Sequence, residues 1–91
     1  MSQQRGSLII VDDNQMNRDA LSRRLERKGY AVQVAEDGQR ALGLIAQHPF
    51  DLVLLDIEMP VMSGLDVLKV LRTTYAPTQM PIIMVTAKTQ S

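Results

Sequence analysis

Short apolar runs alternate with longer amphipathic segments along the chain. The apolar runs predict strands at 8–11, 31–35, 52–55 and 82–85. The segments between them carry apolar residues at helical spacing, which predicts helices at 14–28, 39–48 and about 65–75. Each helix must bury its apolar stripe against a sheet, and crossovers between parallel strands are right-handed. The alternation therefore predicts an α/β fold, with a parallel sheet that is covered by helices on both faces.

Local signals set the expected ends and faces of these elements. The first helix would place an apolar face toward the sheet and stop at Gly29; that face comprises Met16, Ala20, Leu21 and Leu25. Asp37 and Gly38 are typical of a turn and a helix cap. The run 52–55 has no polar alternation, which is typical of a strand buried on both faces.

Acidic residues stand where two of the predicted strands end. Asp12 and Asp13 follow the strand at 8–11, and Asp56 follows the strand at 52–55. The carboxyl ends of parallel strands meet at one edge of a sheet, so we expect these acids and Thr86 to converge there. Grouped carboxylates repel one another without a compensating cation. Mg²⁺ takes oxygen ligands and keeps waters and phosphate oxygens, so the pattern predicts a magnesium site with phosphoryl chemistry.

Simpler interpretations exist for the same residues. Asp12 and Asp13 could cap the helix that begins at residue 14. Thr86 could be an ordinary β-branched residue at a strand end. The methionines at positions 59, 62, 80 and 84 are expected to fill the core and loops, because methionine fits irregular gaps.

Composition limits the class of protein. Ninety-one residues allow one domain, and 45% apolar with 22% charged residues is typical of a soluble globular chain. No apolar run approaches a membrane span, and residues 1–6, an expected flexible tail, lack the apolar core of a signal peptide. A cytoplasmic location is therefore expected. Ten basic and ten acidic residues give no drive toward nucleic acid, and no cysteine is present.

Three motifs resemble those of receiver domains of two-component response regulators. They are Ile10-Val11-Asp12-Asp13-Asn14, the segment from Asp51 to Pro60 with Gly64 after it, and the segment from Pro81 to Ala87. They occur in the family's order and spacing over nearly the whole chain. The resemblance implies a flavodoxin-like, doubly wound sheet with strand order 2-1-3-4.

The resemblance also implies a function for the acids. Asp56 would be the phosphoacceptor, receiving a phosphoryl group from a histidine kinase or phosphotransfer protein. Mg²⁺ would be held by Asp12, Asp13, Asp56 and the backbone carbonyl of Glu58. The chain would act on no separate substrate, so it would not be an enzyme beyond phosphorylating and dephosphorylating itself.

Two further residues would connect the site to a signal. By the resemblance, the Thr86 hydroxyl would contact a phosphoryl oxygen, and the small Ala87 would leave the approach to Asp56 open. Phosphorylation adds about −1.5 to −2 charge units, which would draw the hydroxyl inward and switch an unknown output domain.

The chain departs from the family pattern in two ways. Glu58 stands where many relatives carry a neutral residue, so the lifetime of the phosphoryl group is open. A complete receiver also has a fourth helix, a fifth strand ending in a lysine, and a fifth helix; Lys88 lies in the loop after Thr86 and cannot take that lysine's role. Residues 1–91 would thus be one truncated receiver domain, impaired in phosphoryl transfer and prone to form homo-oligomers through the edge of the strand at 82–85.

Two other functions stay open. The chain could be an interaction module that keeps the receiver fold without being phosphorylated. It could also be a magnesium-dependent phosphohydrolase of the haloacid dehalogenase type, which uses a strand-terminal aspartate. That second possibility is weaker, because such enzymes carry Asp-x-Asp early in the chain, whereas Glu58 stands two residues after Asp56.

Overall fold

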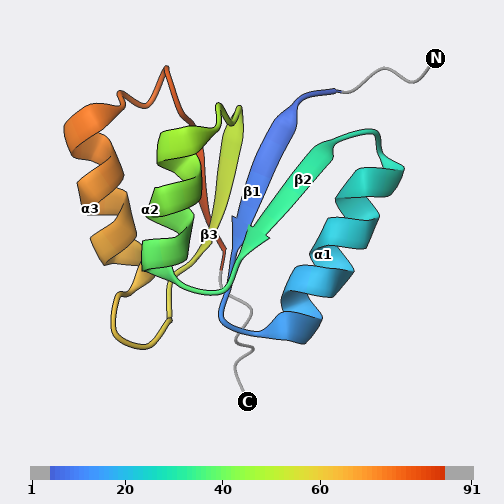
Figure 1. Ribbon diagram of the computed structural model, residues 1–91, viewed down its shortest axis with the longest axis horizontal. Helices are drawn as coiled ribbons and strands as arrows, with labels where there is room; N and C mark the ends of the chain where they lie inside the picture. The colour runs from blue at the N-terminus through green and yellow to red at the C-terminus, as the bar shows by residue number, and fades with distance from the viewer. Residues whose placement is uncertain (1–4, 86–91) are drawn as a thin grey trace.

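The computed structural model describes residues 5–85, which form a parallel sheet flanked by helices (Figure 1). The elements in chain order are β1 (Ser7–Val11), α1 (Gln15–Arg27), β2 (Ala31–Ala35), α2 (Gly38–Gln47), β3 (Leu52–Asp56), α3 (Gly64–Thr74) and β4 (Ile82–Val85). Every element predicted from the sequence is present, with its ends shifted by no more than one residue.

The strands follow the order β2-β1-β3-β4, and all neighbouring pairs are parallel. Val11 at the end of β1 pairs with Ala35 of β2 and Leu55 of β3, and Asp56 pairs with Val85 of β4. The predicted strand order is therefore confirmed. The register aligns the carboxyl ends of the strands along one edge of the sheet.

Polar side chains define the helix starts. Asn14 caps α1 by accepting a hydrogen bond from the backbone N–H of Asn17 at 3.0 Å. Asp37 caps α2 in the same way, as the sequence predicted. Ser63 and Asp66 form a reciprocal capping box at α3, which satisfies two backbone donors at once.

The main core lies between the sheet and the pair α2 and α3, which cover the same face (Figure 1). Its buried members are Ile9, Val11, Ala35, Ala41, Ile45, Phe50, Val53, Leu55, Met59, Val67, Leu71 and Met80. Met62 and Met84 pack against this cluster, so the four methionines fill the core and its margins as expected.

The opposite face is covered by α1, the only helix there among residues 5–85 (Figure 1). The predicted apolar face of α1 is only partly right: no residue of α1 is buried, and Met16 is 80% exposed. The helix packs over β1 and β2, without a second helix of the described chain beside it. Leu52 and Leu54 of β3 are consequently half-buried, so the prediction that this strand is buried on both faces is wrong for one face.

The expected tail at residues 1–6 stays a prediction, because residues 1–4 are outside the described part. Arg5 and Gly6, however, are hydrogen bonded: the Arg5 N–H donates to the Gly29 carbonyl, and the Gly6 carbonyl accepts from the Ala31 N–H. None of the helices in the described part is long and apolar enough to cross a membrane.

Candidate metal centre

The fold brings the acids of two strand ends together. Asp12 and Asp13 follow β1, Asp56 ends β3, and one carboxylate oxygen from each lies within 4.8 Å of the others. Two oxygens on opposite sides of one Mg²⁺ would be about 4.2 Å apart, so small side-chain movements suffice for shared ligation. An all-oxygen donor set also fits the chemistry of this ion. For these three acids, the predicted convergence is therefore confirmed.

Asp12 is 4% exposed and is held from several sides. Its N–H donates to the Ala35 carbonyl at 3.1 Å, and its Oδ1 accepts from the Asn14 N–H at 2.8 Å. The Arg18 guanidinium donates to its carbonyl oxygen at 2.7 Å. The cap of α1 is Asn14, so helix capping does not by itself explain the acid pair.

Asp56 is 3% exposed and occupies the last position of β3. Its Oδ1 accepts a hydrogen bond from the backbone N–H of Glu58 at 3.3 Å. This contact, made by the backbone two residues further along the chain, orients the Asp56 carboxylate. The residue is thus shielded by its strand yet lies within the acid cluster.

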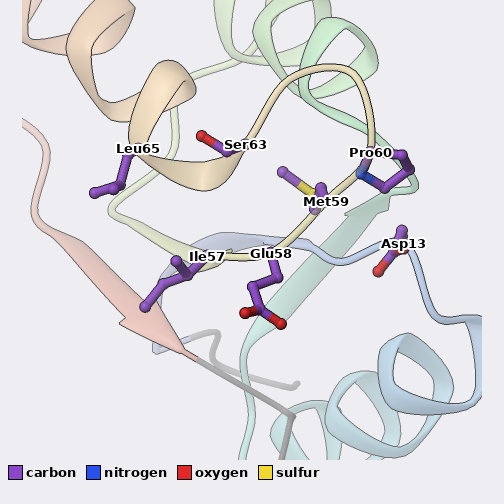
Figure 2. Close-up of a pocket in the computed structure, with 7 residues that line it drawn as sticks. All are labelled: Asp13, Ile57, Glu58, Met59, Pro60, Ser63 and Leu65. Atoms are coloured by element: carbon purple, nitrogen blue, oxygen red, sulfur yellow. The ribbon is translucent and has the colours of Figure 1, made fainter.

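A pocket of about 490 Å³ opens beside the cluster (Figure 2). It is lined by Asp13, Ile57, Glu58, Met59, Pro60, Ser63 and Leu65. Asp13 and Pro60 lie at one end of this pocket, and Ile57 and Leu65 lie at the other (Figure 2). Asp13 belongs to both the cluster and the pocket, so the pocket opens next to the acid cluster.

Two close contacts around the cluster were not predicted. Arg18 appeared in the sequence as one of several basic residues of the first helix, and nothing in the pattern distinguishes it as the one that bonds Asp12. Gly64 belongs to the second motif, but its close approach to the backbone of Asp56 depends on the path of the intervening loop. Neither contact has a signature in local sequence.

Thr86 and Ala87 lie outside the described residues. The last described residue, Val85, is the register partner of Asp56. Ligation by the Glu58 carbonyl also stays a prediction.

A family model described as the response regulator receiver domain matches residues 8–91. The chain belongs to this family. It is 42% identical over 81 residues to response regulator MprA of Mycolicibacterium vanbaalenii, covering 89% of this chain and 34% of that protein. It is 43% identical over 81 residues to transcriptional regulatory protein CpxR of Escherichia coli strain K12, covering 89% of this chain and 33% of that protein. This receiver chain spans about one third of the length of these curated relatives.

Solved structures agree with the receiver fold. The N-terminal domain of a response regulator receiver protein from Methanoculleus marisnigri matches with a TM-score of 0.87 and 36% identity, over 97% of this chain and 72% of that one. Response regulator TrrA from Thermotoga maritima matches with a TM-score of 0.83 and 36% identity, over 97% of this chain and 71% of that one. The TrrA structure is a complex with Mg²⁺ and BeF.

Proposed function

We propose that this receiver accepts a phosphoryl group on Asp56, in a reaction that depends on Mg²⁺, from a histidine kinase or phosphotransfer protein. The observation that carries the proposal is the cluster of Asp12, Asp13 and Asp56 beside an open pocket. Its setting in a chain of the receiver family supports the assignment.

The proposed chemistry is a single phosphoryl transfer. A carboxylate oxygen of Asp56 attacks the phosphorus of a phosphohistidine, and a new P–O bond forms as the P–N bond breaks. The leaving imidazole nitrogen keeps the electron pair and takes up a proton. The product is an acyl phosphate on Asp56.

The chain's own residues would prepare this step. Asp12, Asp13, Asp56 and the Glu58 carbonyl would hold Mg²⁺, which supplies positive charge next to the phosphoryl oxygens when it is bound. The Glu58 N–H orients the Asp56 carboxylate through its bond to Oδ1. With Mg²⁺ bound, the mutual repulsion of the three acids would no longer oppose the fold.

The proposed switch lies at the end of β4. Val85 pairs with Asp56, which supports a role for the next residues, Thr86 and Ala87, at the phosphoryl group. Roughly −1.5 to −2 added charge units would attract the Thr86 hydroxyl and repack the adjoining loop. An output domain, not identified by this chain, would respond to that change in a cytoplasmic signalling pathway.

The alternatives differ in what they require of Asp56. An interaction module with the same fold needs no phosphorylation. A phosphohydrolase of the dehalogenase type needs turnover of a separate ester, and membership of the receiver family leaves that reading without support.

The test is to incubate the chain with acetyl phosphate or phosphoramidate and Mg²⁺, and to measure its intact mass. We expect one phosphoryl adduct on the wild type and none on Asp56→Asn. Asp19→Asn removes an exposed acid of α1 outside the cluster and should keep the adduct. No adduct on the wild type would favour the interaction module, and multiple turnover of a phosphoester would favour the hydrolase.

A further inference from the structure

One arginine of α1 contacts the loop of Asp12, Asp13 and Asn14 between β1 and α1, called the acid loop below. The Arg18 Nη1 donates to the carbonyl oxygen of Asp12 at 2.7 Å, while the Arg18 backbone N–H donates to the Asn14 carbonyl at 3.1 Å. Arg18 is half-buried, whereas Arg23, five residues further along α1, is exposed. Arg18 is thus built into the site rather than into the solvated surface of α1.

The contacted carbonyl belongs to the peptide group that joins Asp12 to Asp13. The preceding N–H of Asp12 is fixed by the Ala35 carbonyl, and the Asp12 carboxylate is fixed by the Asn14 N–H. The bond from Arg18 adds a third constraint, which restricts rotation of the plane of that peptide. The direction in which the Asp13 side chain leaves the backbone depends on this plane.

We propose that Arg18 is a positioning residue for the divalent-cation site, acting through the Asp12–Asp13 peptide. By holding this peptide from α1, it would keep both carboxylates directed toward Asp56. The inference rests on the proposed function, because it concerns the same metal site.

A positioning role for Arg18 and a simple effect of its charge predict changes of opposite sign in Mg²⁺ affinity. A guanidinium near the cluster repels a cation, so removing its charge alone would strengthen Mg²⁺ binding. Loss of ligand positioning has the opposite sign, because Mg²⁺ requires nearly ideal octahedral geometry. Partners that orient metal ligands typically change metal affinity by about 10–100-fold when removed.

The experiment is calorimetric titration of Mg²⁺ and Ca²⁺ into wild type, Arg18→Met and Arg23→Met. Arg23→Met is the matched control, since it removes the same charge from the same helix at an exposed position. We expect Arg18→Met to bind Mg²⁺ at least about tenfold more weakly, near the lower end for ligand-orienting partners. Ca²⁺ tolerates flexible geometry, so its affinity should fall less, whereas Arg23→Met should bind both ions as the wild type does.

A second variant and a metal-free measurement keep the proposal falsifiable. Arg18→Gln retains a polar end but is too short to reproduce the contact, and it should show the same loss if Arg18→Met does not fold. In metal-free protein, the Asn14 amide should exchange hydrogen faster in the Arg18 variants than in Arg23→Met, because the acid loop is released.

The outcomes separate the two proposals. Wild-type or tighter Mg²⁺ affinity in the folded Arg18 variants would overturn the role of Arg18 and leave the metal site in place. A wild type that binds no Mg²⁺ would overturn the proposed function, and this inference with it. Equal losses of Mg²⁺ and Ca²⁺ affinity would also count against positioning.

Discussion

Gly64, the first residue of α3, lies directly against the backbone carbonyl of Asp56. A Cβ built on Gly64 would overlap that carbonyl oxygen and press on the Cα of Ile57. The Gly64 N–H also donates to the Ile57 carbonyl at 2.9 Å. The absence of a side chain therefore lets the start of α3 close onto the strand end that carries the candidate phosphoacceptor.

Gly64→Ala should destabilise the fold, because the obstructing atoms are backbone and cannot rotate away. We expect the free energy of unfolding in urea to fall by about 1–3 kcal/mol. Gly43→Ala is the control: it lies within α2, nothing is within 4 Å of its added Cβ, and it should raise the same quantity by about 0.5–1 kcal/mol. Equal effects of the two substitutions would contradict the close approach.

Val61 occupies a strained turn in the loop between β3 and α3. Its φ is 70°, and the Met62 N–H donates to the Pro60 carbonyl at 2.7 Å across it, as in a three-residue γ-turn. The side chain is fully exposed, so no packing offsets the strain of a β-branched residue.

Val61→Gly should therefore raise the free energy of unfolding by about 1 kcal/mol, since relief of about 1–3 kcal/mol of strain exceeds the added entropy of the unfolded chain. Val61→Ala keeps a Cβ at the same φ and should give a smaller gain. Thermal unfolding of the three proteins compares them directly. A glycine variant less stable than the alanine variant would show that the turn is not strained.

Glu58 shares the pocket with Asp13 and adds a negative charge beside the acid cluster. Glu58→Gln should weaken Mg²⁺ binding by about twofold to fivefold, because the neighbouring attraction for the cation is lost. The loss should shrink at high salt, since Glu58 is exposed and screened. Calorimetry at two ionic strengths measures both effects.

Glu26→Gln provides the comparison for Glu58, because Glu26 is an exposed acid near the other end of α1. It should leave Mg²⁺ affinity unchanged. Tighter binding by Glu58→Gln would instead mean that the carboxylate competes with the site.

The sequence predicted the meeting of Asp12, Asp13 and Asp56, because it depends only on strand order and direction. The cap of α2 was also predictable, because it depends only on Asp37 and on the Gly38 that follows it. The exposure of Met16 could not be predicted, since it depends on which helices share a face of the sheet. The Arg18 bond to Asp12 depends on one rotamer, which no periodic pattern encodes.

The exposed edge of β4, together with the sheet face that α1 leaves uncovered, predicts self-association of the 91-residue chain. In the described residues β4 pairs only with β3, and Ile83 on β4 is 50% exposed, beside the half-buried Leu54 with which it is in register. An apolar edge strand of this kind is a template for pairing with another chain. We expect association at roughly tens of micromolar by gel filtration with light scattering, and its loss in Ile83→Lys. Leu65→Lys changes a leucine of similar exposure, 52%, on α3, and should leave association intact. A wild type that stays monomeric in this range would contradict pairing through β4.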